Sequence, residues 1–224
     1  MTDTPTVSEP QSEDQDDPAL FRQRRTSISD IRETYATQAD RMARLSWLNR
    51  LFTGRYRRDL FGRAEGRVLD VACGTGLNRR YLPDSVEYVG VDISPEMLAN
   101  ARERNGDGAT FREMDAGELA FTDDSFDTAV SSLSTCTFPD PVAALEEMAR
   151  VCRPGGRVLL LEHGRSDVAP LARFQDWRAD AHFRKHACRW NQRPLRNVAE
   201  AGLSVTETTT ALFGVLTAIE ARPE

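Results

Sequence analysis

The chain has 224 residues, of which 40% are hydrophobic, and a formal net charge of −6 at pH 7. This length suits one α/β core rather than two domains. The acidic balance argues against a nucleic-acid partner, because sequence-independent affinity for phosphates comes from an excess of lysine and arginine.

The first 20 residues are rich in Asp, Glu, Ser, Thr, Gln and Pro and lack the apolar run of a secretory signal. They predict a disordered acidic tail over residues 1–20. No stretch of the chain approaches the roughly 20 apolar residues that span a bilayer. The sequence therefore predicts a cytoplasmic protein, with peripheral contact at a membrane as a variant of that expectation.

The four cysteines are far apart in the sequence and form no C-x-x-C pair. This spacing suggests neither a zinc site nor a disulfide framework, so we expect reduced thiols and no bound metal. The residues are Cys73, Cys136, Cys152 and Cys188.

Two helices are predicted ahead of the sheet and form an N-terminal helical cap over residues 27–63. Residues 27–47 repeat apolar side chains at steps of three and four, which favours a helix laid against the core. Residues 47–61 mix apolar side chains with arginines. Such a basic amphipathic stretch either lies on an anionic membrane surface or forms an ordinary surface helix, and Gly54 weakens the helix prediction.

Strands and helices alternate between residues 67 and 161, a pattern typical of βαβ units and a parallel sheet. A helical segment with Phe174, Trp177 and Phe183 follows, and we interpret residues 166–190 as a lid-like insertion. The remainder reads as helix, strand, strand, and the last two would close the sheet as an antiparallel hairpin. The predicted strands cover 67–71, 88–92, 109–112, 126–131 and 157–161, with helices over 77–82, 95–104 and 141–152.

An apolar run at residues 68–76 ends in an acid and a glycine turn, with Asp70, Gly74 and Gly76. The next predicted strand ends in Asp92. Ligands in open α/β sheets collect at the carboxyl ends of parallel strands, and an acid after the second strand holds ribose hydroxyls. The two segments predict a site for a nucleotide-like cofactor.

The glycine pattern argues against a dinucleotide. A dinucleotide fingerprint needs a third glycine where this chain has Arg79, and Asp70 would repel a pyrophosphate. S-adenosylmethionine carries an ammonium and a sulfonium and no phosphate, so it suits an acid at this position. An NAD-dependent oxidoreductase is the disfavoured alternative.

Four segments together resemble the class I S-adenosylmethionine-dependent methyltransferases: VLDVACGTG at 68–76, VGVDISPEML at 89–98, MDAGELAFTDDSFD at 114–127 and RVCRPGGRVLLLEHG at 150–164. The resemblance covers nearly all of the chain after the tail. It implies a single Rossmann-like domain over 27–223, with helices on both faces of a mostly parallel sheet, and S-adenosyl-L-methionine as cofactor.

Finer features resemble the quinone and phospholipid (type 11) branch of this family. Ala72 stands where many members have glycine, as in the quinone-methylating enzymes. The segments 159–166 and 187–195 are similar to a fungal mitochondrial inner-membrane protein of the branch and to its prokaryotic relatives. The resemblance therefore favours a small, apolar acceptor such as a quinone precursor or a lipid.

The resemblance also implies roles for single residues around the cofactor. Those expected near its methionine part are Asp70, Ala72, Gly74, Gly76, Ser131 and Leu133, and those expected near its ribose and adenine are Asp92, Ile93, Met97, Asp115 and Ala116. Each has a purely structural alternative. Asp92 and Ser94 fit a helix cap, Met97 fits the core, and Asp115 fits a turn.

Candidate catalytic residues are His163, as a general base after the last parallel strand, and Tyr35, which would lie over the cofactor. The alternatives are a histidine bonded to a loop or to Glu162, and a core aromatic. Arg165, Arg189 and Trp190 suit an anionic or aromatic head group, or they clamp the final helix to the core. Cys136 is interpreted as a packed small residue rather than a nucleophile.

The leading hypothesis is a methyltransferase that acts on a small or lipid-like substrate and has possible peripheral contact with a membrane. The alternative is a protein that binds S-adenosylmethionine and acts as an assembly or interaction factor without an acceptor of its own. The acceptor atom and the oligomeric state do not follow from the sequence.

Overall fold

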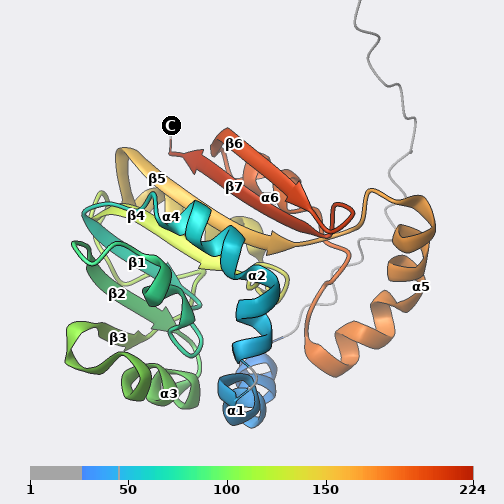
Figure 1. Ribbon diagram of the computed structural model, residues 1–224, viewed down its shortest axis with the longest axis horizontal. Helices are drawn as coiled ribbons and strands as arrows, with labels where there is room; N and C mark the ends of the chain where they lie inside the picture. The colour runs from blue at the N-terminus through green and yellow to red at the C-terminus, as the bar shows by residue number, and fades with distance from the viewer. Residues whose placement is uncertain (1–26, 45, 224) are drawn as a thin grey trace, which may run out of the picture.

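The computed structural model describes residues 27–44 and 46–223, so the predicted acidic tail lies outside the described residues. Its centre is a seven-stranded sheet with the order β3-β2-β1-β4-β5-β7-β6 (Figure 1). The strands are β1 (Arg67–Val71), β2 (Glu87–Asp92), β3 (Thr110–Glu113), β4 (Phe126–Ser132), β5 (Cys152–His163), β6 (Ser204–Ala211) and β7 (Leu216–Arg222).

Six α-helices and two short 3₁₀ helices are described around this sheet. They are α1 (Ile28–Arg44), α2 (Ser46–Phe61), η1 (Leu77–Tyr81), α3 (Pro95–Asn105), η2 (Gly106–Gly108), α4 (Pro141–Val151), α5 (Ala169–His186) and α6 (Pro194–Glu200).

The sheet has the predicted topology. Strands β1 to β5 pair in parallel, whereas β7 runs antiparallel to both β5 and β6. The inner strands β1 and β2 are buried on both faces and are nearly continuous apolar runs, whereas the parallel edge strand β3 buries only Phe111. The predicted α/β class with an antiparallel C-terminal hairpin is confirmed.

Helices cover both faces of the sheet and form two apolar layers. One layer packs α2 and α3 against the sheet and includes Phe61 and Leu98. The other packs α4 and α6 and includes Met148 and Val198. All four side chains are at most 1% exposed, so each layer is a closed core that holds the strand ends in fixed positions.

Two predicted elements differ from the structure. The helix expected over 77–82 is the 3₁₀ helix η1, and β5 begins five residues earlier than expected. The helix predicted over 47–61 is confirmed as α2, which runs through Gly54 without a break. A Cβ at Gly54 would lie 3.1 Å from the Tyr81 hydroxyl, so the glycine lets α2 approach η1 closely.

The segment predicted as a lid-like insertion contains α5, which stands beside the carboxyl end of β5 rather than on a face of the sheet (Figure 1). Ala172 and Gln175 are its buried side chains. Gln175 donates to the carbonyl of Gly164 and accepts from the backbone N–H of Ser166, which ties the helix to the chain that follows β5. A lid role for this insertion stays a prediction.

Candidate cofactor and acceptor site

A cavity of about 330 Å³ lies at the carboxyl ends of β1, β2 and β4, under the N-terminal helix α1. This volume is at the lower end of the range for small-molecule sites. Parallel strands place their following loops at one edge of the sheet, and the cavity is where those loops meet. Its position agrees with the site expected from the sequence.

The loop after β1 presents its backbone to the cavity. Gly74 has a φ of +54°, and a Cβ there would have no atom within 4 Å, so its backbone faces open space. Ala72 has a φ of +53° and also lines the cavity. A side chain is disfavoured in this left-handed region, which explains why glycine suits the position of Ala72.

Asp92 closes β2 and forms the centre of the second loop. Its Oδ2 accepts a hydrogen bond from the N–H of Gly74 at 2.8 Å, and its Oδ1 accepts one from the N–H of Ser94 at 2.9 Å. Burial raises the pKa of Asp92, whereas these backbone donors oppose that rise. The carboxylate is therefore held rigidly at the cavity wall, 8% exposed.

Most residues predicted to surround the cofactor do line the cavity. They are Ala72, Gly74, Asp92, Ile93, Met97, Asp115, Ala116 and Leu133. Two of the structural alternatives hold at the same time: Ser94 caps α3 by accepting from the N–H of Met97, and Asp115 accepts from the N–H of Gly117. A capping or turn role does not remove these residues from the cavity wall.

Three predicted cofactor residues do not line the cavity. Asp70 is completely buried beneath it, and its oxygens accept from Asn78 at 2.9 Å and from Tyr88 at 2.8 Å. Gly76 packs against α3, where a Cβ would clash with Asn105. Ser131 donates to the carbonyl of Val71 inside the sheet. Direct contact of these three with a ligand stays a prediction, and in this structure they support the cavity wall from behind.

Burial dominates the electrostatics of Asp70. It raises the pKa of Asp70 to about 6, although hydrogen bonds from Asn78 and Tyr88 and the charge of Arg57 oppose the rise. Asn78 itself lines the cavity, so Asp70 acts on the site through the amide that it orients.

Sequence reasoning missed Arg57, which lines the cavity and is 2% exposed. Its guanidinium donates to Asn78, to Ser132 at 2.6 Å and to Thr53 at 3.0 Å. Burial lowers its pKa to about 10, opposed by Asp70, so the group stays charged at neutral pH. The sequence pattern that could have indicated it is helical spacing. Arg57 follows Thr53 by four residues and precedes Leu60 by three, and both of these are buried, so Arg57 lies on the inner face of α2.

Of the two predicted catalytic residues, one lines the cavity. Tyr35 does so from α1, and burial raises the pKa of its hydroxyl, which also hydrogen-bonds Thr137. His163 is not on the cavity wall, and its Nε2 faces the sulfur of Cys188 at 3.4 Å. Its neighbour Glu162 instead accepts from the backbone N–H groups of residues 134 and 135.

The three predicted substrate residues clamp the insertion to the core and do not line the cavity. Arg165 pairs with Asp176 at 3.0 Å. Arg189 donates to the carbonyl of Phe138 at 2.7 Å. The indole of Trp190 donates to the carbonyl of Gln175 at 3.0 Å. These contacts are to α5 and to the loop after β4, not to the final helix that the structural alternative named.

Comparison with known proteins agrees with this geometry. Residues 69–160 match a family described as a methyltransferase domain. A phosphatidylethanolamine N-methyltransferase of Cereibacter sphaeroides is 44% identical over 112 residues, which are 48% of this chain and 55% of that protein. A ubiquinone/menaquinone biosynthesis C-methyltransferase of Bdellovibrio bacteriovorus is 39% identical over 113 residues, 47% and 48% of the two chains.

The resemblance to a fungal mitochondrial protein also holds. The mitochondrial methyltransferase OMS1 of Saccharomyces cerevisiae is 28% identical over 171 residues, which are 63% of this chain and 35% of that protein. The chain thus spans about half the length or less of these curated relatives.

Among solved structures, a putative methyltransferase of Haloferax volcanii in complex with the Trm112 activator superposes with a TM-score of 0.70. It is 24% identical, and the match covers 85% of this chain and 98% of that one. At this identity the likeness speaks for the fold.

The cavity fits the cofactor that such a domain uses, S-adenosyl-L-methionine. An exposed glycine backbone and a fixed carboxylate suit an adenosyl group, because a carboxylate accepts from both hydroxyls of a ribose. The charged Arg57 suits the carboxylate of the methionine part. Residues 69–160 are therefore similar to a methyltransferase domain, and the sheet has the class I methyltransferase fold.

Proposed function

We propose that this chain is an S-adenosylmethionine-dependent methyltransferase that acts on a small, apolar acceptor, either a quinone precursor or a lipid-like molecule. The observation that carries the proposal is the cavity itself. One wall consists of the glycine turn with Asp92, and the opposite wall consists of apolar side chains from α1 and from the loop after β4: Ile28, Ile31, Met42, Leu133, Phe138 and Pro139.

One wall of the cavity would bind the cofactor and the other would bind the acceptor. Bound S-adenosylmethionine supplies a methyl group on a positively charged sulfonium, so the protein has mainly to align the acceptor and exclude water. Asp92 would hold the ribose and Arg57 the carboxylate. Tyr35 keeps its proton at neutral pH, because burial raises the pKa of its hydroxyl, and it is suited to donate a hydrogen bond to the acceptor rather than to remove a proton.

The names of relatives support an apolar acceptor without fixing it. One relative is named for phosphatidylethanolamine and another for ubiquinone and menaquinone biosynthesis. Both names describe acceptors that reside in membranes, which agrees with the apolar wall of this cavity.

A methylation assay tests the proposal. The full chain is incubated with isotopically labelled S-adenosylmethionine and either phosphatidylethanolamine vesicles or a demethylated quinone precursor, and products are identified by mass spectrometry. We expect label in one acceptor and much less label with the Asp92→Asn variant at a cofactor concentration that does not saturate it. Binding of S-adenosylhomocysteine without any labelled product in these or in a lipid extract would contradict methyl transfer and favour a non-catalytic binding protein.

The same proposal predicts that the protein works at the cytoplasmic surface of a membrane. Over the described residues, no helix is both long and apolar enough to cross a bilayer. The outer face of α2, however, exposes Trp47, Leu51 and Phe52 by 57%, 71% and 63%. Arg55 and Arg58 are exposed on the same helix, an arrangement suited to anionic lipid headgroups.

Sedimentation with vesicles tests this contact. The wild type should sediment with anionic vesicles at low salt, whereas a Leu51→Ser/Phe52→Ser double variant should stay in the supernatant. Phe213→Ser is the matched control, because Phe213 is 72% exposed but lies in the turn between β6 and β7. Equal sedimentation of the double variant and the control would contradict a membrane role for α2.

A further inference from the structure

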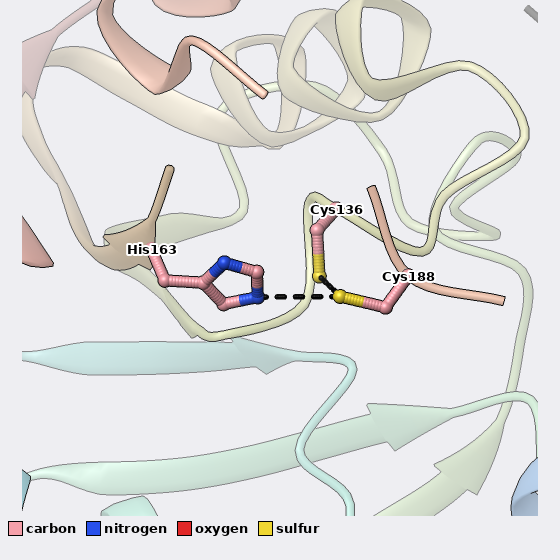
Figure 2. Close-up of side chains that lie close together, drawn as sticks. All are labelled: Cys136, His163 and Cys188. Carbon is pink, nitrogen blue, oxygen red and sulfur yellow. Dashed lines mark hydrogen bonds between the residues drawn. The ribbon is translucent and has the colours of Figure 1, made fainter. Parts of the chain in front are cut away.

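Three side chains with metal-binding atoms meet beside the cavity. Cys136 lies in the loop after β4, His163 ends β5, and Cys188 follows α5. The Sγ atoms of Cys136 and Cys188 are 3.4 Å apart, and the Sγ of Cys188 is 3.4 Å from Nε2 of His163. All three ligand atoms lie within 4.8 Å of one another, and Figure 2 shows the side chains pointing toward one another.

The two distances of 3.4 Å, between the sulfurs and from the Cys188 sulfur to the imidazole nitrogen, are close to those of a tetrahedral zinc site. Bonds of about 2.3 Å to sulfur and about 2.0–2.1 Å to nitrogen place two sulfurs about 3.8 Å apart and a sulfur and a nitrogen about 3.5 Å apart. Two thiolates and an imidazole favour zinc over the hard cations Mg²⁺ and Ca²⁺, which prefer oxygen. We propose that Cys136, His163 and Cys188 bind one zinc ion as its three protein ligands.

The backbone around the trio is fixed by hydrogen bonds that do not involve the ligand atoms. The N–H of Arg189 donates to the carbonyl of Cys136 at 2.9 Å, and its guanidinium donates to the carbonyl of Phe138 at 2.7 Å. Gln192 donates to the carbonyl of His163 at 3.0 Å. The three segments are thus held together before a metal binds, so little ordering free energy opposes binding.

The imidazole is oriented for binding through Nε2. Because Nε2 faces the Sγ of Cys188 at 3.4 Å, Nδ1 is the ring nitrogen that would donate to a backbone carbonyl. Metal-binding histidines commonly donate their second ring N–H to such an acceptor, which leaves the other nitrogen free to bind.

The three proposed ligands lie next to the cavity in which the acceptor would bind. Cys136 precedes Thr137, which lines the cavity and hydrogen-bonds Tyr35. The side chains are secluded, with Cys136 1% and Cys188 9% exposed. Three protein ligands leave a fourth position for a small molecule, the arrangement of catalytic rather than structural zinc sites.

Metal analysis of the intact protein tests the proposal. The full chain is purified under reducing conditions without a metal-affinity tag, incubated with zinc, dialysed, and measured by plasma mass spectrometry. We expect an equimolar amount of zinc in the wild type and in Cys152→Ser, and loss of most of it in Cys188→Ser and His163→Ala. Cys152 is the matched control, because it is a buried free cysteine outside the trio.

Substitution with Co²⁺ gives a second readout that needs no variant. Wild-type protein should show the intense thiolate charge-transfer absorption and the visible bands of four-coordinate cobalt, and excess zinc should abolish them. Absence of these bands, equal zinc in Cys188→Ser and Cys152→Ser, or a Cys136–Cys188 disulfide in peptides from the protein as isolated would each overturn the proposal. Neither readout depends on methyltransferase activity.

Discussion

The two sides of the cavity are built in different ways. On the β1–β2 side, backbone groups hold the cavity wall in place. The N–H groups of Gly74 and Ser94 donate to the carboxylate of Asp92, and the N–H of Met114 donates to its carbonyl at 3.0 Å. On the α2–β4 side, side chains hold the wall in place. The guanidinium of Arg57 donates to Asn78 and Ser132, which are 21 and 75 residues away in the sequence.

This difference has consequences for function. A wall of backbone groups keeps its shape when neighbouring side chains change, so it suits a cofactor that does not vary. The apolar side chains from α1 and from the loop after β4 change with each substitution, so that part of the cavity suits an acceptor that differs between relatives, whereas Arg57 would hold the carboxylate of the cofactor. Buried charges also gather on the second side, and the largest effects of mutation on stability are expected there.

Arg57→Leu should have the largest effect. It removes a buried charge near Asp70, takes one of two donors from the oxygen of Asn78 and leaves the hydroxyl of Ser132 without the guanidinium donor, so we expect the free energy of unfolding to fall by about 4 kcal/mol. Denaturant unfolding measures it. Arg58→Leu, at an exposed site on the same helix, should change it by less than about 0.5 kcal/mol. Similar changes in the free energy of unfolding for Arg57→Leu and Arg58→Leu would contradict the claim that buried side-chain contacts hold the α2–β4 side of the cavity together.

Asp92→Asn tests the backbone side. In the wild type, an oxygen of Asp92 accepts the N–H of Gly74. The substituted amide has one oxygen instead of two, so it cannot accept from both hydroxyls of a ribose. We expect the affinity for S-adenosylhomocysteine to fall about 100-fold, which corresponds to about 3 kcal/mol. Calorimetric titration measures this. Asp115→Asn, on the same cavity wall, should lose less, and an unchanged affinity in Asp92→Asn would place the ribose elsewhere.

Asp70 makes stability depend on pH. Its pKa is about 6 in the folded protein against 3.8 in the unfolded chain, so the folded state binds more protons between these values and stability falls as pH rises through this window. The full difference is roughly 3 kcal/mol. Asp70→Asn should lack this fall, so its stability relative to the wild type should rise between pH 4 and pH 7. Parallel pH profiles of the two proteins would show that Asp70 ionises normally.

Ala72→Gly should have the smallest effect. Relief of the left-handed backbone is worth about 1–2 kcal/mol and the added flexibility of glycine costs about 0.5–1 kcal/mol, so a gain of up to about 1 kcal/mol is expected. Ala101→Gly in the buried middle of α3 is the opposite control and should destabilise by about 1 kcal/mol. A melting temperature that falls equally in both variants would argue against strain at Ala72.

The sequence predicted the backbone side well and the side-chain side poorly. Ala72, Gly74 and Asp92 lie in short segments whose strands and turns follow from local patterns, so their meeting at one sheet edge was foreseeable. Arg57 was assigned to a surface stretch, and Cys136 and Cys188 were judged too far apart in sequence to act together. Their contacts depend on how α2 and α5 pack against the sheet, which local patterns do not encode.

A crystal structure of the full chain with S-adenosylhomocysteine tests the central claim most directly. The account predicts the ligand in the cavity at the ends of β1 and β2, with both ribose hydroxyls donating to the carboxylate of Asp92 and its amino-acid carboxylate near Arg57. A ligand bound elsewhere on the protein, or no ligand at saturating concentration, would contradict it.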